Sequence, residues 1–288
     1  MSTPIEGALA VWYLLTGASL VFLVWDLLTN TPTGRVMKLA WVLVVFYTGP
    51  IGLFIYLLSC RQPLPGTHDA FIAPHWKQAT GSLLHCVAGD ATGIIISAAI
   101  VYHFGLPNGI DLIIEYLFAF GVGLFVFQAL FMLAMYNGDY WLAVRKTFFA
   151  ETVSMNMVMV GMIPTMVILM HAIPGADSPF HATFWAVMSL ATMAGMATAY
   201  PINSWMVRRG LKHGMMSAIA KSAGEKEPAA PPPMEAGMDM SHDMQHSHHD
   251  SALPTAKMAA VLAGTFAVLA LSLWITTLFA PITFTRME

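Results

Sequence analysis

The sequence predicts an all-α membrane protein, a polytopic bundle of about seven transmembrane helices. Of its 288 residues, 57% are hydrophobic and only 10% are charged. The mean hydropathy of +0.65 lies far above that of a soluble globular domain. A spanning helix needs roughly 20 mostly apolar residues. Seven runs meet this requirement, near residues 6–28, 36–59, 79–104, 110–136, 147–171, 182–206 and 257–280.

These runs divide the chain into four parts. Residues 1–76 hold the first two helices and their loop. The first run lacks a basic leader and is longer than the apolar core of a signal peptide, so we expect the mature protein to keep it. Residues 77–215 form a four-helix core. Residues 216–256 are rich in Pro and Ala, then in His and Met, and predict a disordered linker. Residues 257–288 add a C-terminal helix to this six-helix body.

The basic residues predict an orientation, because Lys and Arg are favoured in cytoplasmic loops. If the N-terminus is cytoplasmic and all seven runs cross, ten of the 13 basic residues lie in the cytoplasm. Arg35, Lys38 and Arg286 lie outside, and the first two make the first hairpin the weak point of this orientation. The sequence thus predicts a bacterial inner-membrane protein with its C-terminus outside. Cys60 and Cys86 then face no oxidising compartment, so we expect free thiols.

Several function classes are disfavoured. The net charge of −3 and the lack of a basic stripe argue against a nucleic-acid partner. The chain has no Gly-rich phosphate loop, Ser-His-Asp order, Cys-x-x-Cys or His-Glu-x-x-His motif, so we do not expect an enzyme. A membrane redox enzyme would need a chromophore. The histidine pair placed for a b-type haem, His103 and His171, fits the membrane interface better.

The third run contains "LLHCVAGDATGII", with a polar face that carries Cys86 and Asp90 and with His85 beside it. Ionisable groups inside a bilayer cost several kcal/mol and normally face protein. Gly89 and Gly93 also form a small-xxx-small pair, which predicts close approach of another helix. This face is therefore either a ligand site or a packing surface with polar bonds across it.

The fifth and sixth runs add further candidate ligands at a similar depth. Glu151 and Met155 share one face of the fifth, and Met196 lies on the sixth. At about 1.5 Å per residue, all these groups fall in the cytoplasmic half of the membrane. A thiol, an imidazole, carboxylates and thioethers suit a soft cation such as Cu(I) better than Ca²⁺ or Mg²⁺. Methionine on a membrane helix is also common as a packing residue.

The linker contains "MDMSHDMQHSHHD", the strongest chemical signal in the chain. Imidazole and thioether groups on a tether bind copper, zinc or nickel, and methionine beside histidine favours copper. The alternative is a solvated spacer that happens to be rich in histidine. The candidate ligands of this His/Met tract are Met238, Met240, His242, Met244, His246, His248 and His249.

Three stretches together carry a family resemblance: "HCVAGDATGII", "ETVSM" followed by Gly161 and Met162, and "FWAVMSLATMAGMATAYPINSWMVRRGLKHGM". The chain resembles the bacterial integral-membrane family catalogued as domain of unknown function 4396, over roughly Lys77 to Met215. The resemblance implies a helical membrane domain and no particular activity. It also implies a further thiol and a further acidic residue in many members, where this chain has Asp90 and Ile94.

These patterns predict an inner-membrane protein that handles a soft transition metal, most simply copper, by transport or transfer. The expected path leads from the His/Met tract to His85, Cys86, Asp90 and the groups at their level. The expected partners are the lipid bilayer and copper-handling or respiratory-enzyme proteins. The alternative is a non-transporting accessory or assembly subunit of a membrane metalloenzyme, docked through the third helix.

Overall fold

The computed structural model describes residues 3–215 and 253–285 and confirms the predicted helical bundle. It contains seven helical segments long and apolar enough to cross a membrane, which mark a multi-pass membrane protein. The predicted linker and the His/Met tract fall almost entirely outside the described residues. Six of the long segments are α1 (Thr3–Thr29), α2 (Arg35–Ser59), α4 (His75–Val101), α7 (Tyr140–Ala172), α8 (Ala182–Arg208) and α10 (Thr255–Thr277).

The remaining long segment, Asn108–Tyr136, is continuous but not uniformly α-helical. It comprises α5 (Asn108–Gly121), the π-helix η2 (Val122–Gln128), α6 (Ala129–Met132) and the 3₁₀-helix η3 (Leu133–Tyr136). Two short elements complete the described fold: α3 (His68–Ile72), in the loop before α4, and the 3₁₀-helix η1 (Tyr102–Phe104), directly after α4. A π-helical stretch inside a membrane helix is uncommon and often marks a functional region.

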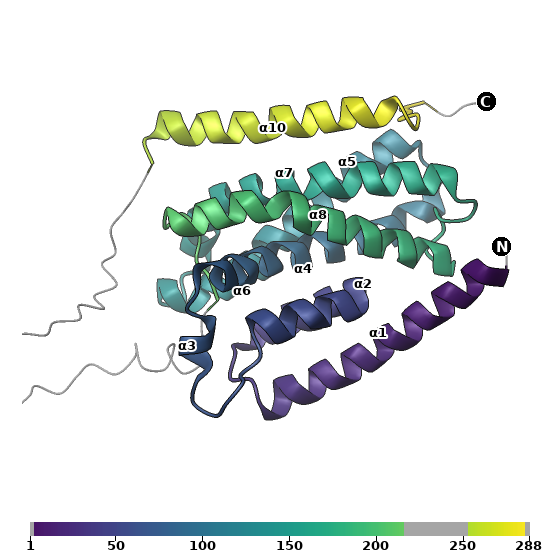
Figure 1. The fold of residues 1–288 in the computed structure, drawn as a ribbon. Coiled ribbons are helices and arrows are strands. Elements are labelled where there is room, and N and C mark those ends of the chain that lie inside the picture. Colours follow the sequence, from purple (N-terminus) through teal and green to yellow (C-terminus); the bar gives the residue numbers. More distant parts are fainter. Residues whose placement is uncertain (1–2, 216–252, 286–288) are drawn as a thin grey trace, which may run out of the picture.

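Helix α4 lies at the centre of the bundle. It packs against α2, α5, η2 and α8, while α7 pairs with α8 and α10 on the side away from α1 (Figure 1). A Cβ atom added to Gly89 would stand 2.7 Å from the Cα of Gly123, and one added to Gly93 would stand 2.5 Å from the Cα of Ala119. The predicted close approach at these two glycines is therefore confirmed, and the partner is the α5–η2 segment.

Helix α2 does not run straight through the bundle. At Gly49 the backbone leaves the helical conformation, with φ of 59° and ψ of −137°, and Pro50 follows. A straight helix of this length would separate its ends by roughly 37 Å. Instead, the Asn30 side chain, just before α2, donates a hydrogen bond of 2.9 Å to the carbonyl oxygen of Gln62, just after it. The two halves of α2 therefore form a re-entrant hairpin whose ends lie together.

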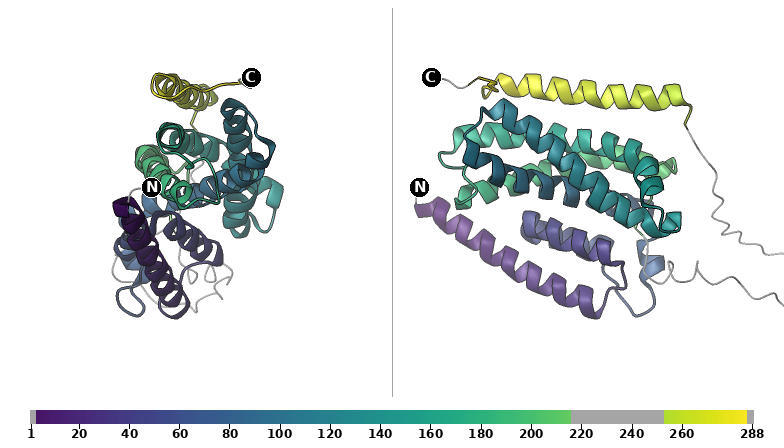
Figure 2. Two further views of the ribbon diagram at one scale, coloured as in Figure 1. Left: turned by 90° about the vertical axis from the view of Figure 1, so that its right-hand side faces the viewer. Right: turned by 180° about the vertical axis from the view of Figure 1, so that it is seen from behind.

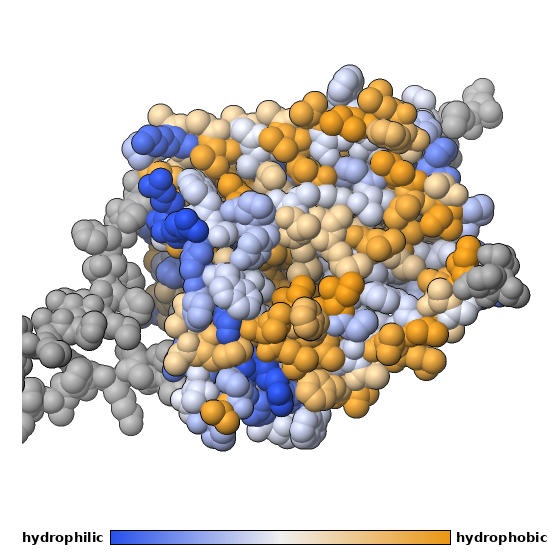
Figure 3. Space-filling view, viewed as in Figure 1, coloured by the Kyte–Doolittle hydropathy of each residue, from blue (hydrophilic) through white to orange (hydrophobic). Residues whose placement is uncertain are grey.

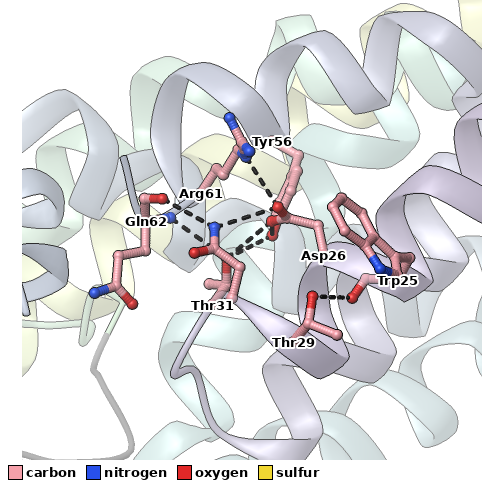
Figure 4. Close-up of polar contacts among 8 residues, drawn as sticks. Trp25, Asp26, Thr29, Thr31, Tyr56, Arg61 and Gln62 are labelled. Atoms are coloured by element: carbon pink, nitrogen blue, oxygen red, sulfur yellow. Dashed lines mark hydrogen bonds and ion pairs between the residues drawn. The ribbon is translucent and has the colours of Figure 1, made fainter. Parts of the chain in front are cut away.

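A buried carboxylate, Asp26 at the end of α1, fastens the two ends of this hairpin (Figure 4). Arg61 Nε donates to its Oδ1 at 2.9 Å, and Tyr56 Oη donates to its Oδ2 at 2.6 Å. Thr31 Oγ1 donates to Oδ2 at 3.1 Å, and Asn30 Nδ2 donates to Oδ1 at 3.2 Å. Each carboxylate oxygen thus has one partner from the loop before α2 and one from the last turns of α2 or the loop after it, which makes this cluster a structural clamp.

We call the two ends of the bundle the α3 end and the terminal end. The α3 end holds the loops around residues 30–34 and 60–74, and there His75 Nε2 lies 3.0 Å from Ser204 Oγ. The terminal end holds both described chain ends (Figure 1). There the Tyr13 hydroxyl donates to the carbonyl of Ala182, and the Gly109 N–H donates to the carbonyl of Thr283. The view from behind shows both termini at this same end (Figure 2, right).

Among the described residues, Lys and Arg are confined to one end of the bundle. Every Lys and Arg within residues 3–215 and 253–285 lies on a segment at the α3 end. On the face drawn in Figure 3, most of the hydrophilic surface also lies toward that end. These ten residues are Arg35, Lys38, Arg61, Lys77, Arg145, Lys146, Arg208, Arg209, Lys212 and Lys257.

Candidate functional site

Five polar side chains meet inside the bundle and form what we call the buried polar centre. They come from four places in the chain: α4, η2, α7 and the segment after α8. Each is at least nine-tenths buried. Groups of this kind are rare inside a membrane and usually serve a function. The members are Cys86, Asp90, Gln128, Glu151 and Lys212.

Hydrogen bonds join four of the five members. The Cys86 thiol donates to Glu151 Oε2 at 2.6 Å, and Gln128 Nε2 donates to the same oxygen at 2.8 Å. Gln128 Nε2 also lies 3.2 Å from the Cys86 sulfur. The Lys212 ammonium donates to that sulfur at 2.8 Å. The sulfur atom is therefore the meeting point of a carboxylate, an amide and a cation.

Asp90, the fifth member, borders a space next to Gly123 that Glu151 also borders. A Cβ atom at Gly123 would stand 2.4 Å from Glu151 Oε1 and 2.8 Å from Asp90 Oδ1. The two carboxylates therefore face the same small space, which exists because residue 123 has no side chain. Neither oxygen of Asp90, nor Oε1 of Glu151, has a hydrogen-bond partner, although all three atoms are buried. Such oxygens are costly unless a proton or a cation neutralises them.

A turn after α8 places Lys212 in the centre. Gly210 adopts the left-handed conformation with φ of 68°, and the N–H of Leu211 donates to the carbonyl of Met206 at 2.9 Å. This arrangement ends the helix and reverses the chain. The following residues fold against the start of α4, where Met215 lies so close to Gly81 that a Cβ there would clash at 2.6 Å. Lys212 thus enters the centre from the α3 end.

Lys212 has a second anchor beside the centre. Its ammonium donates to Asn203 Oδ1 at 2.6 Å, and Asn203 Nδ2 donates to Ser154 Oγ at 2.8 Å. Asn203 also donates to the carbonyl of Ala199 at 2.9 Å. These bonds tie the middle of α7 and the end of α8 to the lysine, so the ammonium is held by neutral oxygen on one side and by the thiol on the other.

The arrangement attracts positive charge. Three acidic groups, Cys86, Asp90 and Glu151, face one ammonium in a region of low dielectric constant. They cannot all be ionised against a single positive charge, so the centre must hold protons or take up a further cation. Two groups already act in this way: the Cys86 thiol donates its proton in a hydrogen bond to Glu151, and Lys212 supplies a tethered cation.

The structure brings together three of the predicted intramembrane ligands. Cys86, Asp90 and Glu151 meet in the buried polar centre. The imidazole of His85 packs against the ring of Phe131 on α6, with 3.6 Å between ring centroids.

The two predicted methionine ligands lie in apolar surroundings. Met155 is buried in the hydrophobic core. Met196 lines an apolar groove of about 390 Å³ between α2, α4 and α8, together with Met193 and Tyr200. The structure thus gives both side chains an apolar packing role.

Residues 3–215 and 253–285 contain no group of three His, Cys, Asp or Glu side chains arranged to hold a metal ion. At the buried polar centre the Lys212 ammonium donates to the Cys86 sulfur, which is the softest candidate ligand there. The seven candidate ligands of the His/Met tract lie outside the described residues. Cys60 and Cys86 are both buried free thiols, as expected.

Two members of the centre, Gln128 and Lys212, were not predicted as site residues. Gln128 is a single amide within an apolar run, "GLFVFQALFM", and a lone polar residue at that depth was an available signal. Lys212 sits in "RRGLKHGM", where three other cationic or titratable side chains give the appearance of a solvated helix end. Its burial depends on the turn at Gly210, which spacing alone does not indicate.

Comparison with known families gives one match, to the central part of the chain. Residues 75–212 match the model of a family described as "Domain of unknown function (DUF4396)". The match begins at the first residue of α4 and ends at Lys212, so it covers every member of the buried polar centre. No curated protein and no solved structure matches the chain.

Proposed function

We propose that this chain, whose residues 75–212 belong to the DUF4396 family, binds a soft metal cation at the buried polar centre and carries or transfers it through the membrane. The observation that carries the proposal is that Asp90 and Glu151 face one small space inside the bundle and that the Cys86 thiol is bonded to the same Glu151 carboxylate. Three of their carboxylate oxygens have no hydrogen-bond partner. The proposal assigns binding and transfer, and no bond-making chemistry.

The cation that fits best is copper. A thiolate is a soft ligand and prefers Cu(I) over Mg²⁺ or Ca²⁺, which take oxygen cages. The His/Met tract follows Lys212 in the sequence and carries imidazole and thioether groups that bind the same ion. In the proposed sequence of events the tract collects the metal and the centre receives it.

Lys212 gives the centre a way to bind and release a metal ion. Its ammonium and a metal ion would compete for the same sulfur, because both are cations that need the electron pairs of Cys86. We propose that the described arrangement is the form in which protons and Lys212 neutralise the centre. Metal binding then requires that Lys212 withdraw and that the thiol release its proton.

The re-entrant path of α2 leads us to revise the orientation. The earlier prediction counted α2 as a crossing and left Arg35 and Lys38 on the outer side. With both ends of α2 at the α3 end, all ten described basic residues lie on one side, and the rule for Lys and Arg makes that side cytoplasmic. We therefore propose that both chain ends lie outside and that the His/Met tract is cytoplasmic, in a bacterial inner membrane.

Cysteine labelling tests this orientation. Glu6, Asp69 and Asp177 are exposed, and each is replaced by cysteine in turn. An impermeant maleimide added from outside should label positions 6 and 177 and spare position 69. If α2 crosses the membrane, positions 6 and 69 will instead react from the same side. The native thiols should stay silent, because both are buried and burial raises the pKa of Cys60 to about 12.

Metal binding tests the function. Cys86→Ser replaces a soft ligand by a hard one of similar size, and Cys60→Ser is the matched control, since Cys60 is equally buried but lies outside the centre. Both are measured in protein lacking residues 224–253, so that the His/Met tract does not mask the result. Cys86→Ser should weaken Cu(I) binding by about 10- to 100-fold, and Cys60→Ser should leave it unchanged. Equal Cu(I) affinity in the two variants would refute the proposal and favour an accessory-subunit role.

A further inference from the structure

A further buried carboxyl group lies outside the buried polar centre, toward the terminal end. Glu115 on α5 is only 7% exposed, and its Oε2 atom is buried without a hydrogen-bond partner. Asp111, one helical turn nearer the terminal end, has a buried Oδ1 without a partner as well. Asp111 and Glu115 are four residues apart, so both lie on one face of α5. None of the bonds of the buried polar centre uses either group.

These carboxyl groups lie on the same face of the α5–η2 segment as Gly123, which borders the space in the buried polar centre. Glu115, Ala119 and Gly123 are spaced by four residues, so they line one face of the α5–η2 segment. Ala119 packs on Gly93 of α4, and Gly123 faces Asp90 and Glu151. Glu115 is therefore about 12 Å from Gly123 along the helix axis, in the direction of the terminal end.

The contact between α4 and α5 separates the two sets of acids. A Cβ at Gly93 would stand 2.5 Å from the Cα of Ala119, so the helices touch at the level between Glu115 and Asp90. Lys212 stands at the opposite end of the centre. Acidic groups therefore lie on both sides of this tight helix contact, one set toward the terminal end and the other in the buried polar centre.

We propose that Glu115, assisted by Asp111, is the proton-exchange station of the outer half of the path. It takes up a proton from the outer solution and gives it up again as the central carboxylates change charge. This inference rests on the proposed function, since the cation that changes their charge is the metal bound at Cys86. The proton moves as H⁺ between a carboxylate oxygen and water, and no electron is transferred. Buried carboxyl groups inside membrane bundles commonly serve such relays.

Glu115→Gln tests the station, because the amide keeps the size and polarity of the side chain but exchanges no proton. Asp177→Asn, an exposed acid at the same end, is the control. In liposomes with an entrapped pH dye, Cu(I) uptake by the unaltered protein should move protons. Glu115→Gln should lower that proton movement by about tenfold or more, with Cu(I) affinity in detergent within about twofold of the original. Proton movement equal to that of Asp177→Asn would overturn the station.

An infrared measurement without metal keeps this test separate from that of the proposed function. The protein should show a protonated-carboxyl band that Glu115→Gln removes and that shifts when the outer solution is exchanged for D₂O. If the unaltered protein binds no Cu(I), the proposed function fails, and the station is then decided by this band alone. A band that exchanges from outside supports proton exchange at Glu115. A spectrum that Glu115→Gln leaves unchanged refutes it.

Discussion

Replacing Gly49 by alanine distinguishes a re-entrant α2 from a straight α2, because the two structures predict changes of opposite sign in the free energy of unfolding. If α2 were straight, Gly49 would be an ordinary helix-interior glycine. Alanine would then stabilise the protein by about 1 kcal/mol, because it loses less backbone entropy on folding. The observed φ of 59° and ψ of −137° predict the opposite, since this backbone conformation is essentially open to glycine alone.

The size of the effect follows from two contributions. Holding a residue with a Cβ in such a backbone conformation costs about 1–3 kcal/mol. The new Cβ would also stand 2.5 Å from Thr16 Oγ1 and 3.1 Å from the Trp12 ring, and overpacking of this kind costs about 1–3 kcal/mol. We therefore expect Gly49→Ala to lower the free energy of unfolding by about 2–6 kcal/mol, depending on how far Thr16 can move.

The assay is reversible unfolding in mixed detergent micelles, followed by circular dichroism. The matched control is Gly17→Ala on α1, where an added Cβ meets no atom within 4 Å and the helix is regular. Gly17→Ala should be neutral or stabilising by up to about 1 kcal/mol. If Gly49→Ala stabilises the protein as Gly17→Ala does, α2 is a straight helix, and the revised orientation falls with the hairpin.

Four further changes test other parts of the structure. Gly89→Ala should lower the free energy of unfolding by about 1–3 kcal/mol, because its Cβ meets backbone at 2.7 Å, whereas Gly121→Ala, with open space around it, should not. Lys212→Met removes the competing ammonium and should tighten Cu(I) binding in a competition titration; weaker binding would contradict the competition. Gly123→Ala fills the space between the two carboxylates and should weaken Cu(I) binding, with a smaller loss of stability than Gly89→Ala. Burial lowers the pKa of His68, so the unfolded chain takes up that proton first as the pH falls. Stability should therefore decline below about pH 6.5, and the unfolding midpoint of His68→Leu should decline less.

The sequence was sufficient for features that depend on local composition. Long apolar runs determine the seven helical segments, and the spacing of Gly89 and Gly93 on α4 predicted their close helix contact. The polar face of α4 was also recognisable, because Cys86 and Asp90 are conspicuous in an apolar run. In each case a single helix carries the whole signal.

Features that depend on chain reversal were not predicted. The pair Gly49 and Pro50 is a known helix breaker, yet the apolar run around it is long enough for one crossing, and length dominated the prediction. Lys212 was counted as a solvated charge, because nothing near it in sequence indicates that Gly210 turns the chain back into the bundle. Met155 and Met196 share a depth with Cys86, but depth does not say which way a side chain points.

The two interpretations of the α4 face, packing surface and ligand site, turn out to depend on each other. Close contact at Gly89 brings the η2 backbone to within van der Waals distance of α4, and this contact positions Gly123 between Asp90 and Glu151. Because Gly123 has no side chain, two carboxylates can face each other across a space that any other residue would fill. The small residues therefore do more than join helices. They bring acidic groups from α4 and α7 together at a buried level where their charge must be neutralised by protons or by a cation.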